Sequence, residues 1–278
     1  MSDAESYRRI AHRLNDLDAR LRMLETHGHR VQSIAPYFSL GAARAIWSMG
    51  SVDIANPIAA DISGNGYDLD AINTPVFGTE GASPYVWFNG TTQYLRKVDG
   101  GAGAWADILG TEPYVTAAER GLTLGGWFKP YRLTNNEFLM GKSTGVAATS
   151  AYSLVFQGAV ANDPVLFSIS TGAAFVSATV QPGISASSWV FVAGRYDPST
   201  EIKVYVGIGD AEPIQTATTV AGIPATLPDV AADFTIGSYS GGASYFSGRA
   251  SRCFLCASML SDEMIHLIYS QTRALYGV

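Results

Sequence analysis

Charged residues are scarce in this 278-residue chain, and cations are scarcer than anions. Asp, Glu, Lys and Arg make up 15% of the residues, hydrophobic residues make up 47%, and the formal net charge is −6. Proteins that bind nucleic acid or an anionic membrane need dense positive charge. The composition therefore argues against both kinds of partner, and it predicts a large apolar core beneath a surface of uncharged polar groups.

Long apolar runs are also absent. No stretch approaches the roughly 18 uninterrupted apolar residues that a membrane-spanning helix needs. Residues 1–30 carry a charge every two or three positions and include several acids, unlike the apolar core of a signal peptide or an acid-poor transit peptide. We expect no membrane insertion and no export directed by this N-terminal segment. The protein could still leave the cell by another route, such as cell lysis.

Cysteine is nearly missing, with Cys253 and Cys256 as the only two residues of this type. A zinc site needs further Cys or His ligands nearby, and the four histidines are scattered. The stretch "RCFLCASM" is typical of a strand, in which residues three apart point to opposite faces and cannot easily form a disulfide. We predict two ordinary thiols.

Catalytic motifs are absent as well. No strand carries the paired carboxylates that glycoside hydrolysis requires, because the acids fall in turns or helices. Neither H-E-x-x-H nor a complete phosphate-binding glycine loop occurs. The sequence predicts a protein that is not an enzyme.

The N-terminal segment has a heptad pattern instead. Apolar residues recur at spacings of three and four, which form the narrow seam of a coiled coil; they are Tyr7, Ile10, Leu14, Leu17, Leu21 and Leu24. A single helix of about 25 residues is marginal in water, so this one needs a partner. We predict an oligomerisation or anchoring helix over residues 1–30, favouring a homotrimer, and a linker over 31–44. A dimer, docking on another protein, and folding back onto the same chain remain alternatives.

From residue 45 onward, short alternating runs are separated by turn residues. "LTLGGWF", "AYSLVF", "VLFSIS" and "IKVYVGI" each place apolar residues on one face, and "SSWVFVAGRYD" is typical of a central strand. Near the C-terminus, Ser261 is a predicted N-cap for a helix whose apolar face contains Ile265, Ile268, Tyr269 and Thr272. These patterns predict an antiparallel sandwich or barrel followed by one short helix.

The order of the motifs resembles a known family. "DISGNGYDLDAIN", "VWFNGTTQYL", "LTLGGWFKP", "SSWVFVAGRYDPSTEIKVYV" and "FSGRASRCFLCASMLSDEMIHLIY" follow one another as in laminin-G-like, concanavalin A-like jelly-roll domains. The resemblance implies an all-β fold over residues 45–278, with two curved antiparallel sheets packed face to face. Relatives often bind calcium at the rim, where Asp61, Asn65 and Asp68 offer oxygens. The alternative, which we favour, is that these residues form a turn and that there is no cofactor.

The resemblance also implies adhesion or carbohydrate recognition. Sugar sites pair a flat aromatic ring with a few polar groups. The loop aromatics are therefore candidate ligand contacts, although each has the alternative role of packing its own loop: Trp105, Tyr131, Tyr239, Tyr245 and Phe246.

An adhesive domain without an export signal fits a virion protein that leaves the cell by lysis. We predict the surface of a phage particle, as a fibre, tail or capsid decoration that is anchored to other virion proteins by its N-terminal helix. Several weak lectin heads on one stalk would gain avidity there. A bacterial cell-surface carbohydrate-binding module and a structural decoration without ligand are the alternatives.

Overall fold

The computed structural model describes residues 43–51, 58–99, 121–209 and 214–278. These residues belong to one compact unit of the chain, Tyr37–Val278. The predicted N-terminal coiled coil and most of the predicted linker lie outside the described residues, so the structure does not test them.

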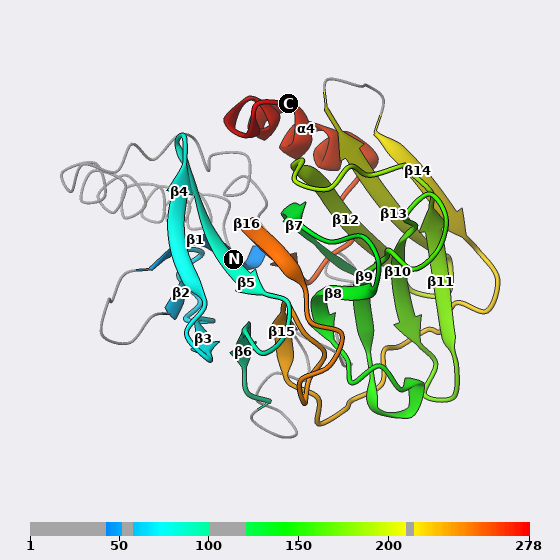
Figure 1. The fold of residues 1–278 in the computed structure, drawn as a ribbon. Coiled ribbons are helices and arrows are strands. Elements are labelled where there is room, and N and C mark those ends of the chain that lie inside the picture. Colours follow the sequence, from blue (N-terminus) through cyan, green and yellow to red (C-terminus); the bar gives the residue numbers. More distant parts are fainter. Residues whose placement is uncertain (1–42, 52–57, 100–120, 210–213) are drawn as a thin grey trace, which may run out of the picture. The chain divides into compact units, whose positions relative to one another are not determined.

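The described strands form one antiparallel hydrogen-bonded path that curls into two facing layers (Figure 1). The first part of the path contains, in spatial order, β11 (Phe175–Val180), β10 (Val165–Ser170), β9 (Tyr152–Gln157), β8 (Asn136–Lys142), β15 (Phe234–Ile236), β6 (Tyr94–Lys97), β3 (Leu69–Ile72) and β2 (Ile58–Asp61). It continues through β1 (Ala43–Ser51), β16 (Ser247–Cys256), β7 (Leu122–Pro130), β12 (Val190–Asp197), β13 (Glu201–Ile208) and β14 (Gln215–Thr219). A hairpin of β4 (Val76–Glu80) and β5 (Ser83–Asn89) joins the path where β5 pairs with β16.

The two ends of this path pack against each other. Strands β10 and β11 contact β13, and β11 also contacts β14. Thr219 Oγ1 on β14 donates a hydrogen bond of 2.8 Å to the carbonyl oxygen of Ser177 on β11. The predicted antiparallel β-sandwich is therefore confirmed.

Alternate residues of the strands fill the space between the layers, as the sequence pattern predicts. Leu122, Leu124 and Phe128 of β7 are fully or almost fully buried in this core. The same alternation places further predicted residues in it: Tyr152, Leu154, Phe156, Val165, Phe167, Ile169, Ile202, Val204 and Val206. Since a one-residue shift would turn every one of these side chains outward, the pattern determines which face of each strand is buried.

The C-terminal helix α4 (Asp262–Thr272) begins and packs as predicted. The Ser261 side chain caps it by accepting a hydrogen bond from the backbone N–H of Met264. The buried residues of α4 are the predicted ones: Ile265, Ile268, Tyr269 and Thr272. A short 3-10 helix, η3 (Arg273–Tyr276), follows. Their aromatic rings pack against Trp127 of β7, so α4 and η3 cover the outer face of this sheet.

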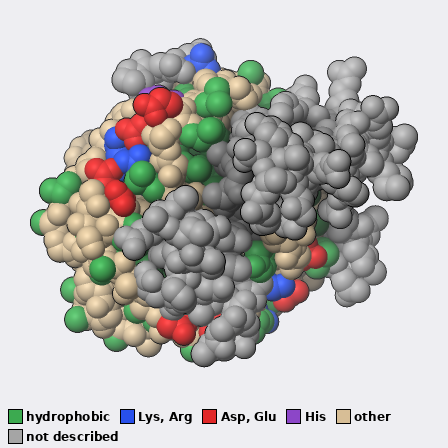
Figure 2. Space-filling model, turned by 180° about the vertical axis from the view of Figure 1, so that it is seen from behind, with side chains coloured by type: hydrophobic (Ala, Val, Ile, Leu, Met, Phe, Trp, Pro, Cys, Tyr) green, Lys and Arg blue, Asp and Glu red, His purple; other side chains and the backbone are tan. Residues whose placement is uncertain are grey.

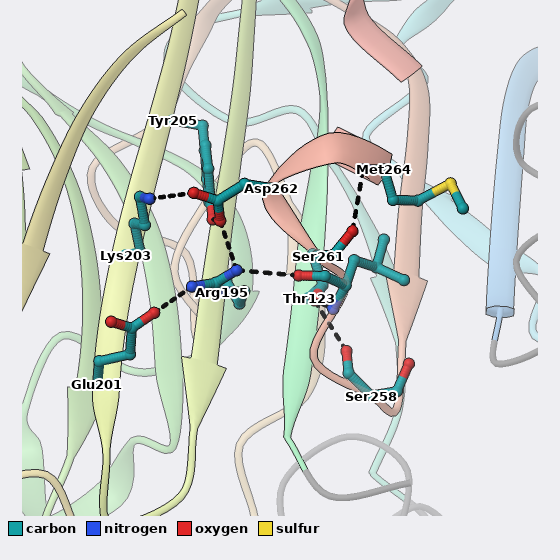
Figure 3. A network of polar contacts seen from close by, with 10 residues as sticks. Thr123, Arg195, Glu201, Lys203, Tyr205, Ser258, Ser261, Asp262 and Met264 are labelled. Carbon is teal, nitrogen blue, oxygen red and sulfur yellow. Dashed lines mark hydrogen bonds and ion pairs between the residues drawn. The ribbon is translucent and has the colours of Figure 1, made fainter. Parts of the chain in front are cut away.

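A balanced network of charges attaches the first turn of α4 to β12 and β13 (Figure 3). The Asp262 carboxylate accepts hydrogen bonds from Arg195 Nη1 (2.6 Å), Tyr205 Oη (2.7 Å) and Lys203 Nζ. Arg195 also pairs with Glu201. Burial acts to raise the pKa of Asp262, but the hydrogen bonds from Lys203 and Tyr205 outweigh it and hold the pKa below its usual value. We call these five residues the helix latch.

The two cysteines lie in β16 as predicted. Both are buried and free. Burial raises the pKa of both thiols, that of Cys256 to about 12, so neither ionises at neutral pH. A bulge between Ser251 and Phe254, at which Arg252 has a φ of 46°, shifts the pairing of β16 with β7.

The described surface agrees with the low charge of the chain. Among the described atoms in Figure 2, backbone and uncharged polar side chains cover much of the visible surface, and acidic and basic side chains lie in a few small groups. In the part of the chain that the structure describes, no helix has the length and apolarity to cross a membrane.

Candidate functional site

The candidate ligand-binding aromatics differ widely in exposure. Tyr131 follows β7 and is 36% exposed. Tyr239 and Tyr245, in the loop before β16, are half-buried. Trp105 lies outside the described residues. The structure therefore offers Tyr131 as the most accessible ring among the described candidates.

Phe246 is a core residue, which corrects its inclusion among the candidates. Its ring has no exposed area and lies 5.9–6.3 Å from the rings of Phe88, Phe128 and Phe156. Its neighbour Tyr245 is only half-buried. A ligand on the surface cannot contact the Phe246 ring.

Tyr239 and Tyr245 hold their loop against the sandwich. The Tyr239 ring lies 4.6 Å from that of Phe138, and burial raises the pKa of its hydroxyl. The Tyr245 ring lies 6.2 Å from that of Tyr94. These contacts correspond to the packing role that we named as their alternative.

A buried carboxylate joins this loop to the segment after β7. Glu137 Oε1 accepts a hydrogen bond of 2.7 Å from Arg132 Nε, and Oε2 accepts one of 3.2 Å from the backbone N–H of Ser247. Arg132 Nη2 donates to the carbonyl of Tyr245 at 3.1 Å. Burial raises the pKa of Glu137 to about 7, against the opposing effect of the bond from Ser247 and the Arg132 charge. These bonds fix the backbone on which Tyr131 stands.

Tyr131 lies beside a group of side chains that sequence reasoning did not find. They come from the β4–β5 hairpin, the end of β7 and the start of β16, which pair side by side. The group is Glu80, Tyr85, Lys129, Tyr131 and Arg249, and we call it the Tyr131 surface. The backbone N–H of Tyr131 donates to the Ser247 carbonyl at 2.8 Å, which ties the ring to the start of β16.

The rings of the Tyr131 surface enclose a guanidinium group. Arg249 Cζ lies 4.1 Å from the centre of the Tyr85 ring and 5.6 Å from that of Tyr131. Tyr85 lies flat on the hairpin because its partner in β4 is Gly78, where an added Cβ would come within 2.8 Å of the ring. The sequence therefore builds a fixed arrangement of ring, cation and ring.

One carboxylate joins the two cations of the Tyr131 surface. Glu80 Oε1 accepts a hydrogen bond of 2.8 Å from Lys129 Nζ, and Oε2 accepts one of 2.6 Å from Arg249 Nη1. Burial acts to raise the pKa of Glu80, but the bonds from Lys129 and Arg249 outweigh it and keep the pKa below its usual value. Lys129 Nζ also lies 5.9 Å from the centre of the Trp189 ring. The surface thus combines partly exposed aromatic rings with charged donors and one acceptor.

The residues considered for calcium form a hydrogen-bonded turn. Asp61 Oδ1 accepts bonds from the backbone N–H groups of Ile46 and Ser63, and Oδ2 accepts bonds from Tyr67 N and Ser63 Oγ. Asp68 Oδ1 accepts from the backbone N–H of Asp61. Among the described residues there is no group of three or more His, Cys, Asp or Glu that could hold a metal ion. These bonds account for Asp61 and Asp68 as turn-forming residues.

Comparison with known proteins agrees with the fold. A laminin G-type family model, described as Concanavalin A-like lectin/glucanases superfamily, matches residues 99–266, which is more than half of the chain. The chain belongs to the concanavalin A-like lectin/glucanase superfamily. The family resemblance that the sequence motifs indicated is thereby confirmed, whereas a virion setting remains a prediction. Among curated proteins, no sequence matches this chain.

Solved structures of the same superfamily fold are distant in sequence. The receptor binding domain of botulinum neurotoxin C/D mosaic serotype is 10% identical with a TM-score of 0.59, and the match covers 85% of this chain and 54% of that one. The botulinum neurotoxin serotype D ligand binding domain, in complex with N-acetylneuraminic acid, is 10% identical with a TM-score of 0.60. That match covers 85% of this chain and 54% of the neurotoxin domain. The botulinum neurotoxin serotype G binding domain is 11% identical with a TM-score of 0.58, and the match covers 82% of this chain and 50% of that one. The chain therefore spans about half the length of these structures, and the likeness shows the fold alone.

The name of the superfamily includes glucanases, and Glu137 is the buried carboxyl group whose raised pKa resembles that of a catalytic acid. A pKa near 7 is typical of a general acid, but glycoside hydrolysis uses two carboxyl groups that both reach the sugar. Both oxygens of Glu137 are engaged by Arg132 and Ser247, and the residue has no exposed area. The geometry gives Glu137 a structural role in holding two loops together.

Proposed function

We propose that this chain is a non-enzymatic carbohydrate-binding protein whose Tyr131 surface contacts the sugar. The observation that carries the proposal is the fixed set of rings and charged groups around Tyr131, on a sandwich of the lectin/glucanase superfamily. Apolar sugar faces stack on aromatic rings, while hydroxyl groups need nearby donors and acceptors. A distant neighbour in the comparison is a ligand binding domain in complex with N-acetylneuraminic acid, which supports the same class of ligand.

Replacing Tyr131 by alanine is expected to weaken glycan binding by about threefold to tenfold, because an aromatic contact contributes roughly 0.5–1.5 kcal/mol. The full-length protein would be tested on a glycan microarray, and the affinity for the best oligosaccharide would be measured by calorimetry. Phe175→Ala is a matched control, because Phe175 on β11 is 37% exposed against 36% for Tyr131.

Two results would contradict this assignment. Equal losses of affinity in both variants would place the binding site elsewhere. Absence of binding by the unmodified protein to any oligosaccharide on the array would contradict the carbohydrate-binding function itself. Firm attachment to particles without glycan binding would then favour the structural decoration.

We propose further that the heptad segment presents several such heads together, as a homotrimer on the surface of a phage virion. The support is the sequence pattern from Tyr7 to Leu24, which lies outside the described residues. Linked heads gain avidity without a stronger individual site. Capsid or tail genes beside the coding gene would support this localisation, whereas genes for a cell envelope would support the bacterial cell-surface module.

The full-length protein is expected to sediment as a trimer at micromolar concentration. Replacing Leu14 and Leu21 together by aspartate should yield monomers, because charge at two core positions of a coiled coil prevents helix association. Analytical ultracentrifugation gives the mass directly. A full-length protein that sediments as a monomer would refute the oligomer, and a dimer would correct its stoichiometry.

A further inference from the structure

The Tyr131 surface has an excess of positive charge. It contains two cations, Lys129 and Arg249, and one anion, Glu80, which gives a net charge of +1 in a chain whose net charge is −6. The helix latch is a useful comparison within the same molecule. Its two cations, Arg195 and Lys203, are balanced by two anions. The balanced group attaches a helix, whereas the unbalanced group lies on a partly exposed surface.

The excess charge is presented by a group whose hydrogen-bonding capacity is not used up. A guanidinium group has five N–H donors in a rigid plane. The structure pairs Arg249 Nη1 with Glu80, and a side-chain hydrogen bond joins Arg249 to Tyr131. Nε is buried, so a ligand would be bound by the remaining N–H groups at the exposed end of the guanidinium. The Arg249 side chain remains 24% exposed. Since Tyr85 and Tyr131 already hold the plane of the guanidinium group, Arg249 needs little further ordering to bind a second anion.

The ion pairs of Glu80 add little to the stability of the fold. The Glu80 side chain is 39% exposed, and ion pairs at that exposure stabilise a fold only slightly. In a binding site, the same carboxylate holds the two cations close together while no ligand is bound.

We propose that the Tyr131 surface selects glycans that carry an anionic group, a carboxylate or a sulfate ester, which Arg249 and Lys129 bind while the sugar contacts Tyr131. This inference rests on the proposed carbohydrate-binding function and names the class of sugar. Glu80 is then a competitor of the ligand's anion. Its removal should strengthen binding, which a purely structural role for Glu80 would not do.

A microarray of matched pairs tests the proposal with the full-length protein. Each neutral oligosaccharide is displayed beside the same oligosaccharide extended with sialic acid, with a uronic acid, or with a sulfate ester. The anionic members are expected to bind about tenfold more tightly, as for one charge-assisted hydrogen bond, and the difference should shrink as salt rises. Comparison of the carboxylate and sulfate pairs identifies which anion is preferred.

Three variants assign the effect to named residues. Arg249→Met should weaken binding of the anionic member by about tenfold. Glu80→Gln should strengthen it by about fivefold, the effect of removing a like charge at short range in a water-like medium. Arg96→Met is the control. Arg96 forms an ion pair with Asp233 and is 35% exposed, but β6 pairs with β3 and β15 rather than with the strands of the Tyr131 surface. This variant should bind like the unmodified protein.

The outcomes separate this inference from the function on which it rests. Equal binding of neutral and anionic members overturns the charge selectivity and leaves the carbohydrate-binding function intact. Weaker anion binding by the Glu80→Gln variant also overturns the inference, because Glu80 would then support the ligand instead of competing with it. Absence of binding to every glycan overturns both.

Discussion

Replacing Trp127 by alanine is expected to lower the free energy of unfolding by about 3–5 kcal/mol, the range for truncating a large buried aromatic side chain. Trp127 has no exposed area. Its ring lies 4.2 Å from that of Tyr276 and 5.7 Å from that of Tyr269, both stacked, and 5.6 Å from that of Phe191. Its Nε1 donates a hydrogen bond of 2.9 Å to Thr272 Oγ1. One side chain thus fastens both α4 and η3 to the sheet.

Urea denaturation followed by circular dichroism measures this loss. Trp127→Phe is the matched control, because it keeps a ring between the two tyrosines and removes the indole N–H. Its expected cost is about 1–3 kcal/mol, that of a buried group left without its partner plus a partly filled site. In hydrogen exchange, the amides of α4 should lose protection before those of β7. A cost below 1 kcal/mol for the alanine variant would show that α4 is held by the helix latch instead.

Local patterns explain how much of the fold the sequence predicts. The alternation in β7, β9, β10 and β13 depends only on neighbouring residues, and so does the capping of α4 by Ser261. Both signals act within a few residues, where sequence spacing and spatial position are directly linked. The sandwich and its C-terminal helix could therefore be predicted without knowing which strand pairs with which.

The Tyr131 surface depends on pairings that no local pattern reveals. Glu80 and Arg249 are 169 residues apart, and they meet only because β4 pairs with β5 and β5 pairs with β16. A local signal for one component was present in "VFGTEGASPYVW". There Gly81, with a φ of 60°, marks a two-residue hairpin turn, and Gly78 faces Tyr85 across it. Sequence reasoning selected Tyr131 as a loop aromatic and missed its neighbours.

The same limitation explains why Phe246 was wrongly included. Glycine and serine in "YSGGASYF" indicate a turn, and aromatics in turns are often exposed. Phe246 lies one residue before β16 begins at Ser247, and its side chain enters the core. Whether Tyr245 or Phe246 faces inward depends on the register of β16, which the turn residues do not specify.

The second large effect is expected at a buried ion pair on the other layer. Lys142 of β8 and Asp99, just after β6, form a contact of 3.1 Å between Nζ and Oδ1, with side-chain exposures of 1% and 8%. The backbone N–H of Asp99 also donates to Asp233 Oδ1 at 2.9 Å, which fixes the position of the aspartate. Removing one partner leaves the other charge buried without compensation. We therefore expect Asp99→Ala to lower the free energy of unfolding by about 3–5 kcal/mol.

A double-mutant cycle separates the pair from its burial cost. Lys142→Met alone should cost less than Asp99→Ala, because the more exposed aspartate reaches water more easily than the ammonium group. The double variant Asp99→Leu, Lys142→Met should recover most of the lost stability, since two apolar side chains of similar volume carry no desolvation penalty. Urea midpoints of the unmodified protein, of Lys142→Met, of the single variant Asp99→Leu and of the double variant give the coupling. If the double variant is no more stable than Asp99→Ala, the uncompensated charge of Lys142 is not the reason for the loss.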